Sequence, residues 1–473
     1  MKEQTIVETT TTHKKTIFHI MIFALPNIGL VLLFGPVIAV LGGIYAKYYN
    51  ISFTSIALVI LIAKVFDAVT DPIIGYYSDR WREQTGSRKP FVLVGGLLVI
   101  PSSYFLFAPP EDVGIVYFAS WYMLFYFSIT TFMIPYMAWA NEFTSSSREK
   151  TLIFSAINIT GQLGGALFYC LPLLPFFVSS DITPEVLKIT AFAGAALLLP
   201  GLFLALTMVP DNALKTTQHN ALIKSTPPSK KIIHILLTIF KNKPFLLYML
   251  AMLFLGIGVG MWSGVFFIYV DSYLKLGNFF ASLSLWGMLC GALAIPIWYR
   301  LTLIWEKRKI LILSQSLFAG ACFCIGLLQP AESASSAIFI INLLLTVSAG
   351  GSAVTALPIL CDIIDYGRLK SKIECAALYF SIQGLLIKTP IAIGSALGFA
   401  VIGWLGFDTH ATVQTAQGIM GLKLGASWIP VLSLLISIGF LAFMSLDENR
   451  VTIIRRRLKA RDEGIGAGSD LRK

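Results

Sequence analysis

The residues with the clearest potential for chemistry lie in one short segment, Lys64-Val-Phe-Asp67-Ala-Val-Thr70-Asp71-Pro72. In a helix, spacings of three and four residues place Lys64, Asp67 and Asp71 on one face. The two aspartates are then about 6 Å apart along the axis, given a rise of about 1.5 Å per residue. Carboxylates this close repel each other unless a proton or a cation lies between them. Hard oxygen ligands suit a small hard cation, so we predict a site for Na⁺, Li⁺ or H⁺ at Asp67 and Asp71, with the Thr70 hydroxyl beside them.

The rest of the chain is apolar enough to place this cluster in a membrane. Of 473 residues, 56% are hydrophobic and only 13% are charged, with a mean hydropathy of +0.76. Soluble domains carry about 25% charged residues. Apolar blocks of about 20 to 30 residues are long enough to cross the hydrocarbon core of a bilayer. Backbone groups in lipid must be satisfied within the segment, so these blocks predict helices, and the alternation typical of a membrane barrel is absent.

Twelve such blocks predict an all-α membrane protein with 12 transmembrane helices. Of the 36 Lys and Arg residues, four lie in the loops assigned outside and two, Lys64 and Lys388, lie within helices. The other 30 lie on the side of the N-terminus, which is the pattern of cytoplasmic loops. We therefore expect a multi-pass protein of the plasma (inner) membrane with both termini in the cytoplasm. The predicted spans are 18–46, 54–77, 90–108, 113–140, 151–178, 187–209, 244–270, 279–300, 309–329, 335–361, 375–404 and 425–445.

A single long polar connection divides these helices six and six. Major facilitator transporters consist of two six-helix bundles joined by a cytoplasmic linker. The two halves are pseudo-symmetric and surround a site near the middle of the membrane. The net charge of +11 is explained by the cytoplasmic loops, so we expect a lipid bilayer and no nucleic acid as partner, and a monomer. The predicted parts are a tail at 1–17, a bundle at 18–210, a linker at 211–243, a second bundle at 244–445 and a basic tail at 446–473.

Two lysines inside predicted helices complete the set of deeply placed charges. A charge at the centre of a bilayer costs about 2.5–3.5 kcal/mol on insertion scales, so each requires a reason. Lys64 shares the helix of the aspartates, whereas Lys388 lies in the eleventh predicted helix, in the other half of the chain. A tethered ammonium that competes with a mobile cation is a coupling device, and we assign Lys388 and Lys64 to it. The alternative is a salt-bridged cluster that only holds two helices together.

Charged residues at predicted cytoplasmic helix ends form a second group of candidates. After the second predicted helix, a glycine permits close helix approach, and Asp79 can cap a neighbouring helix while pairing with an arginine. We interpret this segment as a latch that holds the outward-open state. The latch comprises Gly75, Asp79, Arg80 and Arg88, and an intracellular gate comprises Glu142, Arg148, Asp362 and Asp365. The alternative for the gate residues is that they are solvated helix ends.

Four stretches of the sequence resemble one known family, the glycoside–pentoside–hexuronide:cation symporters of the major facilitator superfamily, best known from melibiose permease. The stretches are Phe66 to Pro72 with Ser87 to Pro90, Ile134-Pro-Tyr136, Asp362 to Gly367, and Ser381 to Lys388. The resemblance implies a transporter that works by alternating access. It also implies that Asp67 and Asp71 bind the coupling cation beside Thr70, and that Lys388 acts in coupling with Gln383 as its neighbour.

The sugar-binding residues of melibiose permease do not carry over to this chain. Met133 replaces an aspartate, Met137 a tryptophan and Ala156 an arginine of that protein, and the first helix lacks its acidic residue. Loss of polar partners lowers discrimination among sugars steeply. Either another sugar is bound through aromatic and amide side chains, or the substrate is less polar, as in the sodium-dependent lysophospholipid transporters that resemble the same family. The candidate cavity residues are Asn27, Tyr122, Tyr126, Asn158, Gln162, Trp262 and Gln383, each of which has helix–helix hydrogen bonding as its alternative.

These features predict a symporter that couples a small organic solute, a sugar or glycoside, to Na⁺ or H⁺. The alternatives are a cation-coupled transporter of a lysophospholipid and a homologue that senses its substrate without transport. A membrane-embedded enzyme requires a nucleophile–base pair or a metal cluster at depth, but the five histidines lie at helix ends or in loops and the six cysteines form no metal-ligand group. We therefore expect no enzyme activity and no cofactor. A channel fits a single charged cluster less well than alternating access does.

Overall fold

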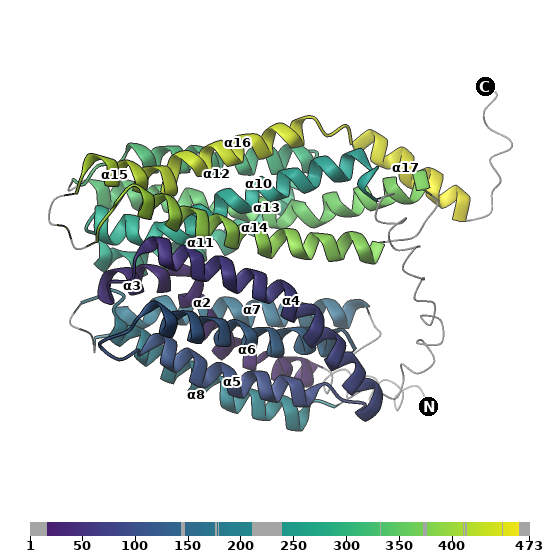
Figure 1. The fold of residues 1–473 in the computed structure, drawn as a ribbon. Helices are drawn as coiled ribbons and strands as arrows, with labels where there is room; N and C mark the ends of the chain where they lie inside the picture. The colour runs from purple at the N-terminus through teal and green to yellow at the C-terminus, as the bar shows by residue number, and fades with distance from the viewer. Residues whose placement is uncertain are drawn as a thin grey trace. The chain divides into compact units, whose positions relative to one another are not determined.

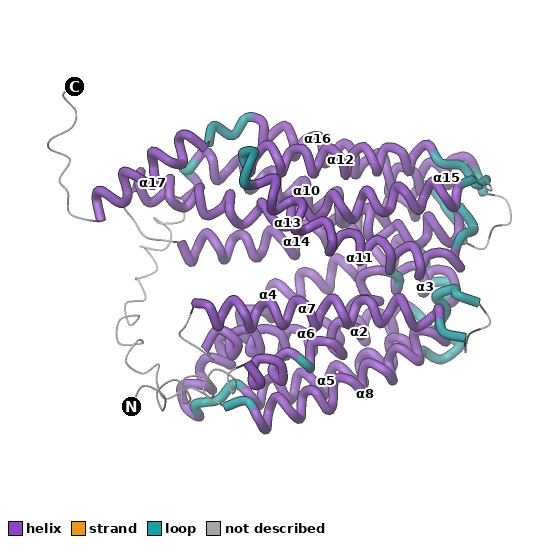
Figure 2. The backbone as a smooth tube through the Cα atoms, turned by 180° about the vertical axis from the view of Figure 1, so that it is seen from behind, coloured by secondary structure: helices purple, strands orange, loops and turns teal. Residues whose placement is uncertain are grey.

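The computed structural model describes residues 17–142, 147–175, 177, 179–210, 239–331, 333–371, 376–409, 411, 414–446 and 448–462. Within these ranges every regular element is a helix, as Figure 2 shows. Twelve of the described helical segments are long and apolar enough to cross a membrane. The predicted all-helical membrane fold with twelve spans is therefore confirmed.

The chain forms two compact units (Figure 1), one of Met1–Ser225 with Leu276–Ser282 and one of Thr226–Lys275 with Leu283–Lys473. In the first unit, α2 packs against α7 and α8, and α6 packs against α4 and α5. The first membrane span begins at Ile17 and ends with α2 at Ala39. The elements of this unit are α2 (Pro26–Ala39), α3 (Leu41–Tyr48), α4 (Phe53–Thr85), α5 (Lys89–Phe107), α6 (Ile115–Glu142), α7 (Ser147–Cys170), η1 (Leu171–Leu173) and α8 (Pro184–Met208).

In the second unit, α10 packs along α14 and α16, and α12 packs against α13. The backbones of α10 and α14 are in contact. A Cβ atom added at Gly260 of α10 would clash with the carbonyl oxygen of Ile391 in α14. The elements are α10 (Lys243–Ile268), η3 (Tyr269–Tyr273), α11 (Gly277–Thr302), α12 (Lys307–Leu327), α13 (Ala334–Ser371), α14 (Ala376–Trp404), α15 (Ala416–Lys423), η4 (Leu424–Trp428), α16 (Ile429–Ala442) and α17 (Glu448–Asp462).

Several helices extend beyond the limits that hydropathy predicts. Helix α4 continues to Thr85 instead of ending near residue 77, and α13 continues to Ser371 instead of ending near residue 361. Hydropathy marks where the chain leaves the apolar layer, whereas a helix ends where its capping residues end it. For α4 this residue is Gly86, whose φ of 78° is the left-handed conformation that closes a helix C-terminus. The last span begins earlier than predicted, at Ala416 rather than 425.

The basic C-terminal segment forms α17, and this helix packs on the protein. Helix α17 contacts α13, and its side chains Val451, Ile454 and Leu458 are buried in an apolar cluster with residues of α10, α12, α13 and α16. An amphipathic face of three apolar residues is sufficient to attach such a short helix to the end of a bundle. Of the predicted linker at 211–243, residues 211–238 lie outside the described part of the chain.

Candidate functional site

Within the acidic cluster of α4, Lys64 and Asp67 form an ion pair. One oxygen of the Asp67 carboxylate has no partner in the described part of the chain. Lys64 Nζ lies 2.9 Å from Asp67 Oδ2, and both side chains are largely buried. The other oxygen of Asp67, Oδ1, is buried and has no hydrogen-bond partner in the described part of the chain. Asp71 follows one turn later and is half-buried. A buried carboxylate oxygen without a partner is energetically unfavourable, so this atom is a candidate cation ligand.

Thr70 lies between the two aspartates and faces the interior of the first unit, where its side chain is buried. Its hydroxyl donates to the backbone carbonyl of Phe66 at 3.0 Å, so the proton points back along α4. The lone pairs of the Thr70 oxygen remain available to a cation. Pro72 has no amide proton and removes one helical hydrogen bond directly after Asp71.

One tyrosine of α6 contacts the ammonium of the cluster, and a second tyrosine contacts the first. Lys64 Nζ lies 5.0 Å from the ring centroid of Tyr126, within the range of a cation–π interaction. The hydroxyl of Tyr122 donates to the hydroxyl of Tyr126 at 3.4 Å. Both tyrosines were predicted as substrate-cavity residues from sequence, and the structure places them beside the candidate cation site. Their role toward a substrate stays a prediction.

The remaining predicted cavity residues of the first unit have different environments. Asn27 is buried, and its amide donates to the carbonyl of Ile157 at 2.7 Å, so this side chain connects α2 to α7. Asn158 and Gln162 are exposed on α7. An exposed amide within a membrane span is consistent with a water-lined surface, while a satisfied buried amide acts as a helix–helix contact.

In the second unit, a cavity of about 360 Å³ is lined by α10, α12, α13 and α14. Gln383, predicted from sequence, lines it and is only 3% exposed. Gln315 of α12 also lines it, although sequence reasoning missed this residue. The signal was present, because Gln315 is a lone amide in the middle of an apolar span. Trp262 lies outside the lining but stacks edge-on against the cavity residue Phe318, at 5.4 Å between ring centroids.

Two of the predicted latch residues, Asp79 and Arg88, form a network with the predicted gate residue Glu142 at the end of α4. Arg88 lies 2.6 Å from Asp79 Oδ1 and 3.0 Å from Glu142 Oε1, and it donates to Ser78. Arg82, which was not predicted, lies 2.9 Å from Glu142 Oε2, whereas the predicted Arg80 is exposed. Arg82 continues the inward face of α4 after two buried residues at intervals of four, so helical periodicity would have found it.

The acids of this network raise the pKa of Arg88. Burial by itself would lower the pKa of Arg88, but hydrogen bonds and charges from Glu142 and Asp79 outweigh it, so the pKa lies above its ordinary value. All members of the network belong to the first unit, where they connect α4, the loop before α5, and the end of α6. The network therefore braces one bundle, and the predicted roles of its members as latch or gate stay predictions.

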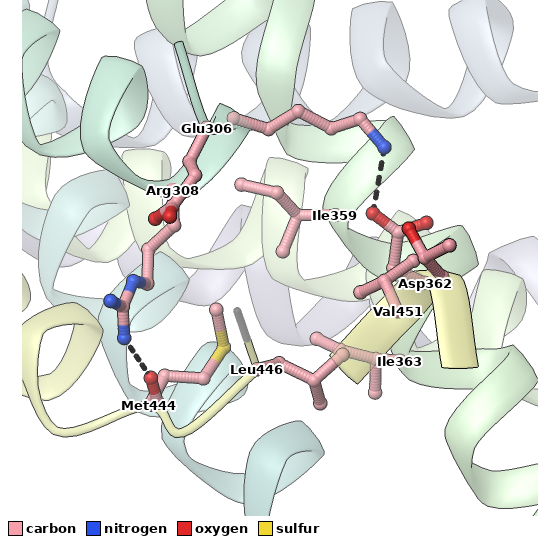
Figure 3. Close-up of a pocket in the computed structure, with 10 residues that line it drawn as sticks. Glu306, Arg308, Ile359, Asp362, Ile363, Met444, Leu446 and Val451 are labelled. Atoms are coloured by element: carbon pink, nitrogen blue, oxygen red, sulfur yellow. Dashed lines mark hydrogen bonds and ion pairs between the residues drawn. The ribbon is translucent and has the colours of Figure 1, made fainter. Parts of the chain in front are cut away.

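A corresponding ion pair lies in the second unit. Lys307 Nζ at the start of α12 lies 2.7 Å from Asp362 Oδ2 of α13. Figure 3 shows this pair in a small pocket, together with the hydrogen bond from Arg308 to the backbone carbonyl of Met444. Asp362 was predicted as a gate residue, and its partner Lys307 was not. The pair connects α12 to α13 beside the start of α17.

The remaining predicted residues lie in α4, α7, α13 and α14. Lys388 is exposed on α14 in the second unit, so its predicted coupling to the aspartates of the first unit stays a prediction. Gly75 is half-buried within α4, and Asp365 is half-buried within α13. The side chain of Arg148 lies outside the described part of the chain.

Comparison with known proteins places this geometry in a family. Residues 14–448 match the family model described as MFS/sugar transport protein. The chain is 25% identical over 404 residues to the raffinose carrier protein of Pediococcus pentosaceus, covering 81% of this chain and 61% of that one. It is 21% identical over 437 residues to the sodium-dependent lysophosphatidylcholine symporter 1 of Gallus gallus, covering 83% and 80%. The crystal structure of the nucleoside transporter NupG aligns with a TM-score of 0.64 and 14% identity, covering 91% and 99%, which bears on the fold alone.

The twelve-span helical fold and these similarities define a membrane transport protein of the major facilitator type. Within that class, the chain belongs to the MFS/sugar transport family, and its resemblance to the glycoside–pentoside–hexuronide:cation symporters is confirmed.

Proposed function

We propose that this protein is a cation-coupled symporter that moves a small organic solute, a sugar or glycoside, across the membrane by alternating access. Na⁺ or H⁺ binds at Asp67 and Asp71 on α4, with Thr70 beside them. The termini lie in the cytoplasm, as the distribution of basic residues favours. Relatives named as symporters and as a raffinose carrier support this proposal.

The observation that carries the proposal is the buried, unpaired Oδ1 atom of Asp67. Lys64 satisfies only the other oxygen of this carboxylate. A carboxylate oxygen in a largely buried position needs a positive or hydrogen-bonding partner, because its desolvation is otherwise uncompensated. A small cation beside Oδ1 supplies that partner, and the nearby Asp71 and Thr70 provide further oxygens.

Lys64 gives this site a means of coupling. Its ammonium lies on the same helix face as the carboxylates and pairs with Asp67. A cation that binds between Asp67 and Asp71 weakens that pair by competing for the carboxylate. Release of the ammonium then changes the contact between Lys64 and the ring of Tyr126, so cation binding on α4 alters the position of α6 side chains. Lys388 of α14 is the second candidate for such competition.

A specific observation favours a less polar solute as the second candidate. The cavity of the second unit is lined mainly by aliphatic side chains, with Gln315, Ser352 and Gln383 as its polar members. The relative from Gallus gallus is named as a lysophosphatidylcholine symporter. A cation-coupled transporter of a lysophospholipid is therefore the alternative to a sugar or glycoside transporter.

Solute uptake into proteoliposomes tests the proposal. Vesicles containing the full chain receive an inward gradient of Na⁺, or separately of H⁺, and a panel of labelled sugars, glycosides and lysophosphatidylcholine. We expect accumulation against the solute gradient in the wild type and none in Asp67→Asn or Asp71→Asn. A membrane potential of about 100 mV adds about 2.3 kcal/mol per charge moved, so accumulation also increases with an inside-negative potential.

Asp112→Asn is the matched control, because Asp112 is an exposed aspartate in a connecting loop. This variant should accumulate solute as the wild type does. Unchanged gradient-driven accumulation in both the Asp67 and the Asp71 variants would refute the assignment of the cation site. Absence of exchange between labelled and unlabelled solute across the membrane would argue against a carrier.

A further inference from the structure

The cavity between α10, α12, α13 and α14 has a polar floor in an otherwise apolar wall. Gln315 and Gln383 are 1% and 3% exposed and lie at the floor with Met252 and Phe318, which are also buried. Leu357 and Ile387 are exposed and lie at the rim. The cavity therefore opens to the surface of the second unit, and the two glutamines line its buried end.

Both glutamines have hydrogen-bonding groups that no described part of the chain satisfies. The Nε2 and Oε1 atoms of Gln315 and the Oε1 atom of Gln383 are buried without a partner. The third polar residue, Ser352, already shares a hydrogen bond with Ser314 at 2.8 Å. Buried amide groups are nearly always paired, so three unpaired amide atoms from two residues that line one cavity indicate a ligand that supplies donors and acceptors.

Gln383 is also held in position from behind. Its side chain interacts with the hydroxyl of Tyr248, which itself donates to the carbonyl of Ala356 at 3.0 Å. A polar group that is positioned by a second contact, and still presents an unpaired oxygen to a cavity, has the arrangement of a binding residue.

The lining also limits the chemistry of the ligand. No charged side chain lines this cavity among the residues described, so the group that enters it is uncharged. A bare sugar ring has hydroxyls on every side and requires many polar partners, whereas this cavity offers the amide of Gln315, the Oε1 atom of Gln383 and a wall of aliphatic and aromatic groups. The lining matches an alkyl, aryl or acyl group that carries a hydroxyl or carbonyl at one end.

We propose that this cavity binds the apolar group of an amphipathic solute, with Gln315 and Gln383 hydrogen-bonded to an adjoining hydroxyl or carbonyl, an assignment that deepens and rests on the proposed transport function. Two sources contain this chemistry, a glycoside with an alkyl or aryl aglycone and a lysophospholipid. The cavity selects solutes by their apolar part, and Gln315 determines specificity.

Equilibrium binding to the full chain in lipid nanodiscs tests this assignment. The probes are methyl and hexyl glycosides of glucose, galactose and xylose in matched pairs, and lysophosphatidylcholine as a separate arm. We expect at least one hexyl glycoside to bind about tenfold more tightly than its methyl partner, because added methylenes leave water, or lysophosphatidylcholine to bind. The first result identifies a glycoside as the source of the apolar group, and the second identifies a lipid.

Two variants test whether the preference for the hexyl over the methyl compound arises in this cavity. Ala353→Phe fills the cavity from its exposed rim, and it should remove the advantage of the hexyl over the methyl compound. Gln315→Leu should weaken binding of the preferred probe about tenfold while the melting temperature of the ligand-free protein stays the same or rises. A purely structural glutamine would instead lower that temperature when replaced. Ala292→Phe, on the exposed surface of α11, is the matched control and should bind as the wild type does.

Equal affinities of all methyl and hexyl partners, together with no binding of lysophosphatidylcholine, would overturn the assignment. Unaltered binding by both cavity variants would overturn it as well. These outcomes are separable from a failure of the transport proposal, because binding in nanodiscs requires no gradient. If only the cavity assignment is wrong, Na⁺- or H⁺-driven uptake still depends on Asp67. If only the transport proposal is wrong, the hexyl preference persists without accumulation.

Discussion

Lys64 and Asp67, one turn apart on α4, form an ion pair of 2.9 Å in which the lysine satisfies one carboxylate oxygen and leaves the other without a partner. This arrangement differs from a closed structural salt bridge, in which both oxygens would be satisfied. It also places a tethered cation in the position where a mobile cation would compete.

Removal of the tethered ammonium should strengthen cation binding. In Lys64→Gln, Asp67 loses its competitor, so the Na⁺ concentration that gives half-maximal thermal stabilisation should fall about tenfold, equivalent to about 1.4 kcal/mol. Gradient-driven uptake should fall at the same time, because the competition that couples cation to solute is lost. Lys47→Gln, in α3, is the control and should leave both quantities unchanged. A higher Na⁺ requirement in Lys64→Gln would show that Lys64 supports the site instead of competing for it.

The arginine network at the end of α4 should contribute measurably to stability. Arg88 is 8% exposed and pairs with Asp79 and Glu142. Breaking a fully buried pair costs about 3–5 kcal/mol, but the two acids are partly exposed, so we expect about 1–3 kcal/mol for Arg88→Ala. Melting temperatures measured in one detergent provide the comparison. Arg88→Lys should restore little of the loss, because a lysine cannot reproduce the two-acid geometry of a guanidinium.

Arg80→Ala is the matched control for this network, since Arg80 is an exposed arginine two residues before Arg82. Its melting temperature should equal that of the wild type. The double variant of Arg88 and Glu142 should be less destabilised than the sum of the single variants, because the two residues share one interaction. Strict additivity would contradict the network.

Close packing of α10 on α14 predicts a severe effect at one glycine. In Gly260→Ala, the new methyl group would meet the backbone carbonyl of Ile391, and a backbone atom cannot move away as a flexible side chain can. We expect destabilisation of about 1–3 kcal/mol or more, seen as a lower melting temperature and a reduced yield of monodisperse protein.

Gly320→Ala gives the comparison, because nothing lies within 4 Å of the added Cβ at that exposed position of α12. Alanine is a better helix former than glycine by about 1 kcal/mol, so this variant should match or exceed the wild type in melting temperature. Equal behaviour of the two variants would show that α10 and α14 are not in backbone contact.

Two neighbouring isoleucines of α17 test how this helix is attached. Ile454 is 6% exposed and Ile453 is 51% exposed. Ile454→Asp places a charge inside the apolar cluster at the end of the second unit and should lower the melting temperature in detergent. Ile453→Asp should have little effect. The reverse order would indicate that α17 attaches through its other face, for example to lipid.

The sequence by itself determined the membrane fold, the twelve spans and the acidic cluster of α4. Hydrophobic blocks report the thickness of the bilayer directly, and a helix fixes the relative positions of residues three and four apart. Lys64, Asp67 and Asp71 could therefore be placed on one face without any knowledge of packing, and Asp67 and Asp71 lie in one of the four stretches that carry the resemblance to cation symporters.

Only the tertiary structure decided which polar groups are satisfied and which are not. The sequence predicts Asn27 and Gln383 equally as cavity residues. In the structure, the Asn27 amide donates a hydrogen bond to a neighbouring helix, whereas Gln383 lines a cavity and has an unpaired oxygen in the described part of the chain. Gln315 and Arg82 carry local signals in the sequence, but what they contact depends on residues far away in the chain, in α14 for Gln315 and at the end of α6 for Arg82. The hydrogen-bond partner of a buried polar atom depends on how the helices pack against one another. The periodicity of one helix does not determine the distances between that helix and its neighbours.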